Sequence, residues 1–406
     1  MNQHAVIKSP PQQPTVSPAA MIGDHAAVLR EQLQAISSGL FPPTSAKTLR
    51  RFSSSEAARI IGVTVSRLQQ LAAEGLGPQP DVSPNGRRSY TLSDIHGIRA
   101  YLDENTRSGR RYQPHRQEGD HLQVIAIANF KGGSGKTTTT AHLAQSLTLR
   151  GYRVLAIDLD PQASLSALLG VQPELDVDTD ETLYGAIRYD DSRRPLGDVI
   201  RHTYFTGLDL VPANLELMEF EHETPRALNK RRAGEPLFFD RVAQAIESVE
   251  ASYDVVVIDC PPQLGYLTLS ALCASTALLI TVHPQMLDVA SMSQFLAMTE
   301  DLLGVVSEAG GNLQYDWLRY LVTRYEQQDA PQTRIVGMLR TLFDDAVLTA
   351  PMLKSSAVSD AGLSKQTLYE IGRDAITRST YDRALEALDA VNAEIEGLIR
   401  KAWGRA

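Results

Sequence analysis

The sequence predicts an α/β fold, with a parallel sheet flanked by helices from residue 121 onward and a small, separate unit in front of it. Six short apolar runs alternate with longer segments of helical character. The runs occupy residues 124–128, 154–157, 208–211, 255–258, 277–282 and 318–322. They lack the apolar–polar alternation of a half-exposed strand, which fits strands buried on both faces. Strands that alternate with helices form parallel sheets.

Length and composition predict a globular protein of two or three domains, with 406 residues and 43% hydrophobic content. Charge is unevenly divided along the chain. Residues 1–120 carry 14 Lys and Arg against 10 Asp and Glu, and the remainder carries 25 against 38. A basic N-terminal part followed by an acidic remainder predicts that the N-terminal part binds a polyanion.

The two cysteines, Cys260 and Cys273, have no metal-ligand spacing and exclude a disulfide framework. The N-terminus shows no basic segment followed by an apolar run. No stretch approaches the ~18 apolar residues of a membrane span. We therefore expect a cytoplasmic protein without membrane contact.

The N-terminal 42 residues divide into a tail and a helix. Residues 1–20 are rich in Pro, Gln, Ser and Ala, a composition typical of disordered segments. Within 21–42, apolar residues such as Leu29 and Leu33 recur near helical spacing. An apolar stripe needs a surface to cover, which is a partner subunit or the chain's own domain. We expect a dimerisation helix.

Residues 44–115 have the rhythm of a helix-turn-helix. One of the serines at 53–55 can cap the first helix, and Gly62 permits the tight turn after it. Base-reading side chains are expected where the second helix begins. The candidates there are Thr64, Ser66 and Arg67.

A basic wing follows this helix pair. Asn85-Gly86 predicts the tip of a hairpin, and Arg87 and Arg88 directly after it can touch phosphate or the minor groove. A helical hairpin that binds no DNA is the alternative, and the basic wing disfavours it. The polar stretch 106–120 then predicts a linker to a domain at 121–406.

The strongest motif comes directly after the first apolar run, where residues 129–137 are Asn-Phe-Lys-Gly-Gly-Ser-Gly-Lys-Thr. Glycines let backbone N–H groups surround a phosphate, and the following helix adds its positive end. Lys136 is expected to contact the β- and γ-phosphates and Thr137 to ligate Mg²⁺. The nucleotide contacts expected from this loop are Lys131, Gly132, Gly133, Ser134, Gly135, Lys136, Thr137 and Thr138.

This loop differs from the ordinary P-loop at two positions. Phe130 replaces the first glycine, and Lys131 adds a second lysine. The pattern Lys-Gly-Gly-x-Gly-Lys-Thr resembles the deviant Walker A motif of the ParA/MinD ATPases. The resemblance implies ATP and Mg²⁺ as cofactors, and a nucleotide-sandwich homodimer in which Lys131 reaches the other subunit's phosphates. A cation in a dry interface stabilises the charge of the phosphoryl group in transfer.

Two further strand ends carry carboxylates. Asp158 and Asp160 share a face at the carboxyl end of their strand, where α/β sheets bind ligands, and Asp259 ends a Walker B-like strand. The resemblance implies that Asp160 positions the attacking water, so that the catalytic residues are Lys131, Lys136 and Asp160. It also implies that Asp158 lies near the magnesium shell and that Asp259 holds Mg²⁺ through water.

Three later segments match the ParA class more loosely. Residues 263–268 correspond to a switch loop that senses the γ-phosphate. Thr323 and Arg324 are candidates for the surroundings of the adenine. His283 departs from the usual strand-end sequence of the class, and we interpret it as a packing residue rather than a catalytic base.

The order of helix, winged unit and ATPase resembles ParA proteins that repress their own operon, above all the RepA partition proteins of repABC plasmids. The resemblance implies a nucleoid-associated partition ATPase that binds operator DNA. It also implies a ParB-type, RepB-like partner that stimulates hydrolysis, and non-specific DNA binding by the ATP dimer. Candidate residues for the non-specific binding are Lys354, Lys365, Arg373 and Arg378.

Three other protein classes share part of this pattern. A MinD-like membrane ATPase is disfavoured because Glu386 and Asp389 in the last helix would be repelled by anionic lipid. A nitrogenase-iron-protein-like carrier needs cluster thiolates at a spacing that this chain lacks. A transcriptional repressor with a mainly structural nucleotide site is the alternative, and Asp160 discriminates because nucleotide binding alone does not require it.

Overall fold

The computed structural model describes residues 17, 21–29, 31–32, 47–105, 111–230, 235–311, 313–373 and 376–405. The chain divides into two compact units, Met1–Lys47 and Thr48–Ala406. In the first, residues 21–29 and 31–32 are helical with exposed side chains. The expected helix is therefore present there. The rest of the predicted helix up to residue 42, and the predicted tail apart from residue 17, lie outside the described residues.

The second unit begins with a winged helix-turn-helix. Its elements are β1 (Phe52–Ser53), α2 (Ser54–Ile61), α3 (Val65–Ala73), β2 (Asp81–Val82), β3 (Arg88–Tyr90) and α4 (Leu92–Asn105). The three strands form an antiparallel sheet in the order β1-β3-β2. Ser53 caps α2 in a capping box with Glu56, and Gly62 ends α2 at φ 81°, which glycine adopts without strain. The predicted cap and turn are thus confirmed.

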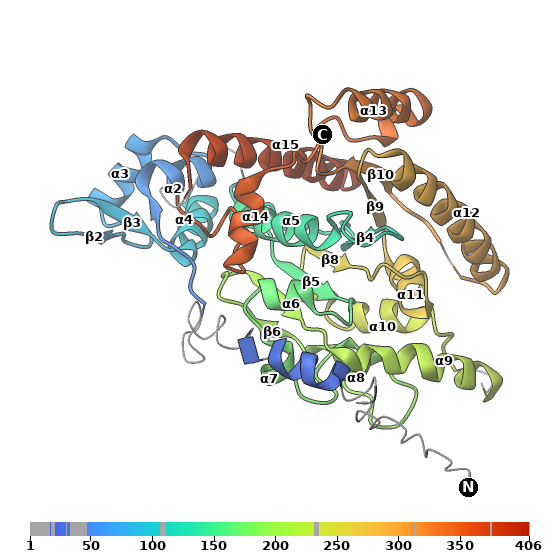
Figure 1. Cartoon of the computed structure of the whole chain (residues 1–406). Coiled ribbons are helices and arrows are strands. Elements are labelled where there is room, and N and C mark those ends of the chain that lie inside the picture. The colour runs from blue at the N-terminus through green and yellow to red at the C-terminus, as the bar shows by residue number, and fades with distance from the viewer. Residues whose placement is uncertain are drawn as a thin grey trace, which may run out of the picture. The chain divides into compact units, whose positions relative to one another are not determined.

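The larger part of this unit is a seven-stranded sheet with helices on both faces (Figure 1). The strands are β4 (Gln123–Ala128), β5 (Val154–Asp158), β6 (Arg201–His202), β7 (Leu208–Val211), β8 (Val255–Asp259), β9 (Ala277–Val282) and β10 (Trp317–Val322). Their order is β10-β9-β4-β8-β5-β7-β6, and only the β6–β7 pair is antiparallel. The six predicted runs all match strands, whereas β6 was missed because it contains no apolar run.

Each central strand faces two cores. In β4, Ile125 and Ile127 contribute to one core, and Ala126 and Ala128 to the other. This two-sided burial is why the strands lack period-2 alternation. The longer helices that cover the sheet are α5 (Lys136–Arg150), α9 (Met218–Lys230), α10 (Asp240–Glu247), α11 (Tyr266–Ala274), α12 (Met286–Glu308), α13 (Ala330–Phe343), α14 (Ser356–Leu363) and α15 (Arg378–Ala402). The shorter helices are α6 (Ser164–Leu168), α7 (Pro173–Asp176), α8 (Leu183–Ile187), η1 (Leu196–Asp198), η2 (Leu215–Leu217), η3 (Glu250–Ser252) and η4 (Asp344–Ala346).

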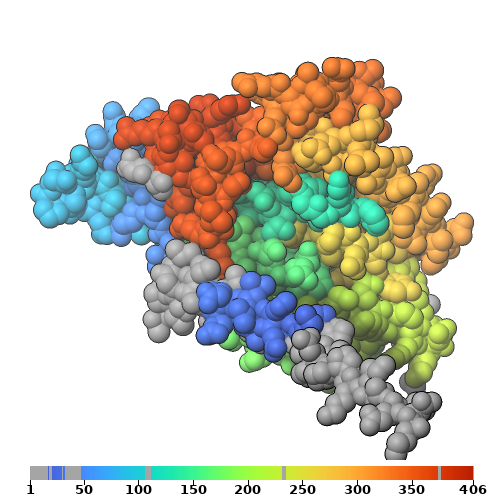
Figure 2. All heavy atoms as spheres, in the orientation of Figure 1, coloured from blue at the N-terminus to red at the C-terminus, as the bar shows by residue number. Residues whose placement is uncertain are grey.

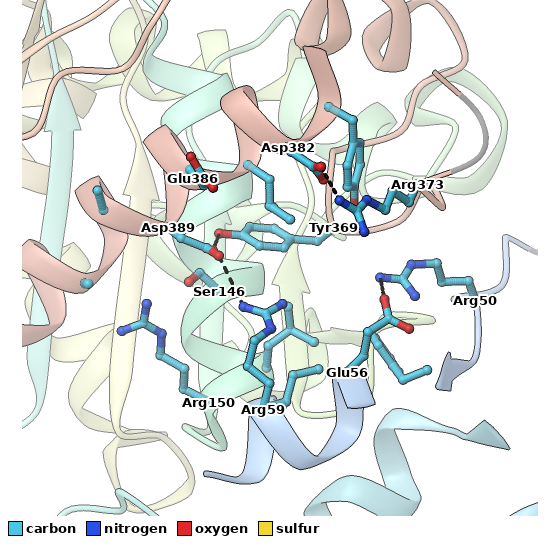
Figure 3. Close-up of a pocket in the computed structure, with 17 residues that line it drawn as sticks. Arg50, Glu56, Arg59, Ser146, Arg150, Tyr369, Arg373, Asp382, Glu386 and Asp389 are labelled. Atoms are coloured by element: carbon cyan, nitrogen blue, oxygen red, sulfur yellow. Dashed lines mark hydrogen bonds and ion pairs between the residues drawn. The ribbon is translucent and has the colours of Figure 1, made fainter. Parts of the chain in front are cut away.

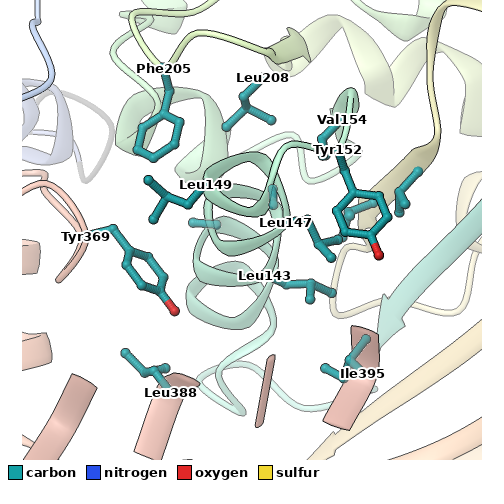
Figure 4. Packing of buried hydrophobic residues seen from close by; sticks show 14 of the residues in the cluster. Leu143, Leu147, Leu149, Tyr152, Val154, Phe205, Leu208, Tyr369, Leu388 and Ile395 are labelled. Atoms are coloured by element: carbon teal, nitrogen blue, oxygen red, sulfur yellow. The ribbon is translucent and has the colours of Figure 1, made fainter. Parts of the chain in front are cut away.

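Helix α5 lies at the centre of the first core, with Leu143 and Leu147 packed toward its neighbours (Figure 4). The same core continues into the winged helix-turn-helix through residues such as Phe52 and Leu68. Figure 2 shows the light-blue atoms of the winged part directly against the red atoms of the C-terminal region. The winged part is therefore docked on the α/β part that contains the seven-stranded sheet.

Polar contacts reinforce this docking. A ring nitrogen of His96 on α4 lies 2.8 Å from the carbonyl of Thr148 near the end of α5. Arg59 of α2 forms an ion pair of 3.5 Å with Asp389 of α15. This pair crosses a cavity of about 810 Å³ between the two parts (Figure 3).

The polar stretch expected to be a linker is also held against the α/β part where it is described. The backbone N–H of Arg116 donates to Asp254 Oδ1 at 3.0 Å, and its guanidinium pairs with Glu250 at 3.0 Å. Residues 106–110 lie outside the described residues. In the described part of the chain, no helix is both long enough and apolar enough to cross a bilayer.

Candidate nucleotide site and DNA-binding surface

The glycine-rich loop joins β4 to α5 at the carboxyl edge of the sheet. Gly133 and Gly135 have φ angles of 75° and 90°, in the left-handed region that favours glycine. Gly135 is the N-cap of α5 and provides no side-chain cap. The first N–H groups of α5 are therefore open to an anionic ligand.

Side chains from β9, which neighbours β4, and from the segment after β10 hold this loop in shape. The Thr281 hydroxyl on β9 donates to Ser134 Oγ at 3.0 Å. After β10, the Thr323 hydroxyl donates to the Ser134 carbonyl at 2.7 Å, and the Arg324 guanidinium donates to the Gly133 carbonyl at 3.2 Å. Thr323 and Arg324, which sequence reasoning placed near the adenine, thus lie against the phosphate loop.

The start of the loop is fixed by Asn129. Its amide nitrogen donates to the Thr281 carbonyl, and its Oδ1 accepts from the Lys131 N–H at 2.9 Å. Sequence reasoning assigned no role to Asn129 or Thr281. Asn129 opens the loop directly after β4, and Thr281 lies near the end of β9, which the fold places beside β4.

The two loop lysines are held differently. Lys136 is buried, and its Nζ donates to the Lys131 carbonyl at 3.2 Å. Burial lowers the pKa of Lys136, an effect that nearby Asp259 opposes. Lys131 instead extends to α12, where its Nζ lies 2.7 Å from Asp288 Oδ1. His283 lies nearest the other carboxylate oxygen of Asp288, with 3.7 Å between its Nδ1 and Asp288 Oδ2.

Two buried aspartates meet beside the loop, because Asp158 of β5 and Asp259 of β8 are register partners. Burial raises the pKa of Asp259 well above its usual range, with Asp158 adding to the effect. Asp259 Oδ2 has no hydrogen-bond partner among the described residues. The Thr140 hydroxyl donates to Asp259 Oδ1 at 3.4 Å, and the Thr137 hydroxyl lies close enough to lower the pKa of this carboxyl. A buried acceptor without a partner beside a threonine hydroxyl fits a hydrated divalent cation.

The Asp158 carboxylate already has protein partners. Its Oδ2 accepts from the Ser166 N–H at 2.8 Å and hydroxyl at 2.7 Å, and its Oδ1 accepts from the Asp160 N–H at 3.2 Å. Burial raises the pKa of Asp158 to about 7, although these bonds from Ser166 act in the opposite direction. Asp158 thus lies beside Asp259 as expected, and its place near a metal ion stays a prediction.

Asp160 lies just beyond β5, half-buried, and its Oδ1 accepts from the Gln162 N–H at 2.9 Å. It is close enough to Lys136 and Asp259 to act on both electrostatically. The fold therefore brings Lys136, Asp158, Asp160 and Asp259 to one edge of the sheet. No three His, Cys, Asp or Glu side chains of the described residues converge as a metal cluster. A magnesium site here would need ligands from threonine, phosphate and water.

The segment expected to be a switch loop leads into α11. Glu221 of α9 accepts from the Tyr266 N–H at 2.9 Å and the Leu267 N–H at 2.8 Å, so it caps α11 from another helix. A Cβ on Gly265 would lie 2.4 Å from the Glu221 carboxylate, so a larger residue there would displace this cap. Sequence reasoning missed Glu221, since a cap from a distant element leaves no local pattern.

The candidate DNA-binding side chains lie on the outer surface of the winged part. Thr64 caps α3 by accepting from the Arg67 N–H at 3.2 Å, and Ser66 and Arg67 are exposed beside it. In the wing, Arg87 is exposed and Arg88 is half-buried at the start of β3. The start of α3 and the wing tip are therefore both accessible to a ligand.

Two of the candidates for non-specific DNA binding are paired with acids. Lys354 lies 2.8 Å from Glu326, and Arg373 pairs with Asp382. Lys365 has a φ of 50°, and Arg378 is the first residue of α15.

Comparisons with known proteins agree with this division of the chain. Residues 122–306 match a family model described as an AAA domain, and residues 52–102 match the model of the MerR HTH family of regulatory proteins. The chain is 59% identical to the putative replication protein A of Rhizobium rhizogenes, over 99% of both chains. It is 30% identical to protein SopA of Escherichia coli, over 89% of this chain and 92% of SopA. A solved partition protein, 20% identical, has the same fold with a TM-score of 0.64 over 94% of this chain and 99% of the other.

Proposed function

Because this chain belongs to the ParA-type partition ATPases with an N-terminal winged helix-turn-helix, we propose that it hydrolyses ATP to segregate a plasmid or chromosome. In this proposal the ATP-bound form is a homodimer that binds DNA without sequence preference, in the cytoplasm and on the nucleoid. A ParB-type, RepB-like partner stimulates hydrolysis. The winged part binds an operator and represses the chain's own operon.

The observation that carries the ATPase proposal is the unpartnered Oδ2 of Asp259 beside the phosphate loop. Thr137 and Asp259 are the residues that would hold Mg²⁺, and a bound Mg²⁺ neutralises charge on the phosphates. Lys136 is buried at the start of α5, where it can bind the β- and γ-phosphates. Asp160 is half-buried in the same edge and can orient a water molecule toward the γ-phosphate.

Operator binding is supported by the exposure of the start of α3 and of the wing. Helix-turn-helix proteins read bases with the first residues of the second helix, where Thr64, Ser66 and Arg67 lie exposed. Arg87 at the wing tip is positioned to contact phosphate. Specific and non-specific binding would thus use different surfaces.

ATP turnover by the full-length protein tests the proposal, measured alone, with non-specific DNA, and with the partner bound to its centromere. We expect low basal turnover that rises with DNA and partner together. The matched variant is Asp160→Ala, which should bind ATP and Mg²⁺ without hydrolysing it. If the wild type responded to neither addition and equalled Asp160→Ala, the chain would instead be a repressor with a structural nucleotide site.

A further inference from the structure

Lys131, the lysine that distinguishes this loop from an ordinary P-loop, is bound to its own chain. Its Nζ lies 2.7 Å from Oδ1 of Asp288, in the first turn of α12. Asp288 is only 6% exposed, whereas the Lys131 side chain is 41% exposed. The carboxylate is therefore part of the folded body, and the lysine is the partner that is free to leave.

The surroundings of Asp288 favour Lys131 as its cationic partner. Among the described residues, Lys131 is the only lysine or arginine that pairs with Asp288, and Asp288 Oδ2 has no hydrogen-bond partner. The other titratable neighbour is His283, at 3.7 Å. A poorly solvated carboxylate favours an opposite charge, so it attracts the Lys131 ammonium. When the lysine leaves, the N-terminal end of α12 still stabilises the negative charge.

The exposure of Lys131 limits the strength of the pair. An ion pair with a solvent-exposed partner shifts an equilibrium by roughly five-fold at most, because water competes for the ammonium. A contact of this strength biases the position of Lys131 and still breaks readily. A fully buried pair would be costly to open.

We propose that the ion pair between Asp288 and Lys131 is a latch. It holds Lys131 against its own chain while the subunit is a monomer, and it must break before two ATP-bound subunits associate. The latch rests on the proposed function, in which Lys131 serves the nucleotide of the neighbouring subunit. Because each association opens one latch in each subunit, the two ion pairs oppose assembly together. Asp288 thereby acts as a positioning residue that raises the concentration at which the dimer forms.

The test compares Asp288→Asn, which keeps the shape of the side chain, with Glu326→Gln as the matched control. Glu326 lies two residues beyond Arg324, and its carboxylate pairs with Lys354 at 2.8 Å rather than with Lys131. The first measurement uses full-length, nucleotide-free protein. An amine-reactive reagent labels the lysines, and mass spectrometry gives the labelling rate of Lys131. The buried Lys136 reports on folding, since a misfolded variant would label there too.

The second measurement is the association constant in the presence of a non-hydrolysable ATP analogue, from sedimentation over a range of protein concentrations. We expect Asp288→Asn to raise Lys131 labelling by up to about five-fold and the association constant by up to about 25-fold, a factor of at most roughly five for each subunit. Glu326→Gln should change neither. Lys136 labelling should stay at the wild-type rate in both variants.

Each outcome has a distinct meaning. Unchanged Lys131 labelling in Asp288→Asn would show that the ion pair does not hold the lysine, and the latch would be refuted. Raised labelling with an unchanged or lower association constant would show that the contact does not restrain assembly. Absence of ATP-dependent association in the wild type would remove the proposed sandwich dimer itself, while the labelling rates would still report on the ion pair.

Discussion

Replacing both wing arginines separates the two expected modes of DNA binding. Arg87 follows Gly86, whose φ is 77°, and the Arg87 carbonyl accepts from the N–H and the hydroxyl of Ser83, both at 2.9 Å. The wing tip is therefore fixed by backbone contacts that Arg87→Ala keeps. The Arg87/Arg88→Ala double variant should lose only the two cations.

The size of the effect depends on how many phosphates the two side chains reach. Each lost phosphate contact lowers the slope of log K against log salt by about 0.9. Between 50 and 200 mM salt, the fall in the operator-binding constant should therefore be smaller by a factor of about 3.5 for one lost contact and about 12 for two. Arg87 is exposed and should contribute a full contact, whereas the half-buried Arg88 should contribute less. Of the two single variants, Arg87→Ala should therefore reduce the salt slope of operator binding more than Arg88→Ala.

Filter binding across a salt series, on operator and on scrambled duplex with ATP, measures both modes in the same samples. We expect weaker operator binding with a shallower salt slope, and unchanged binding of the ATP form to scrambled DNA. Arg51→Ala is the matched control for each single variant, because it also removes one positive charge from the winged part, and Arg51 is already paired with Asp81. Equal loss of both modes in the double variant would point to one shared basic surface and refute the two-site model.

Three further predictions concern the nucleotide site. Lys136→Ala should abolish ATP binding in calorimetry, because its cation is held against the β- and γ-phosphates; retained affinity would overturn the phosphate-loop assignment. Asp160→Ala should keep ATP and Mg²⁺, lose turnover, and accumulate as a DNA-bound dimer in sedimentation with DNA; near-normal turnover would remove its catalytic role. Mixing Lys131→Ala with Asp160→Ala subunits should restore turnover, because a lysine that acts on the neighbouring subunit gives the hybrid dimer one complete site; a hybrid as inactive as its parents would place Lys131 in its own site.

Much of the fold and part of the candidate site follow from local patterns in the sequence. The six apolar runs became strands within one residue of their expected bounds, because burial on both faces leaves a continuous apolar stretch. The turn at Gly62 and the loop around Gly133 and Gly135 were equally visible, since positive φ angles select glycine. The strand-end aspartates Asp158 and Asp259 were found for a similar reason, as parallel strands end at one edge.

The supporting contacts were not visible, because they join residues far apart in the chain. Glu221 caps α11 from α9, and Thr281 holds the loop from β9. Neither has a sequence neighbour that marks its role. The docking of the winged part on α5 and α15 was likewise not visible. The stretch predicted to be a linker is held to the rest of the chain where it is described, because distant partners such as Asp254 bind it.

The sequence by itself determined six of the seven strands of the large sheet, the phosphate loop, the helix-turn-helix and the family, because each depends on residue types at short spacings. Only the tertiary structure decided which side chains meet. It placed Lys131 against Asp288, 157 positions away, and left the Oδ2 of Asp259 without a hydrogen-bond partner. Such pairings depend on strand order and helix packing, which are set by burial over the whole chain rather than by any local motif.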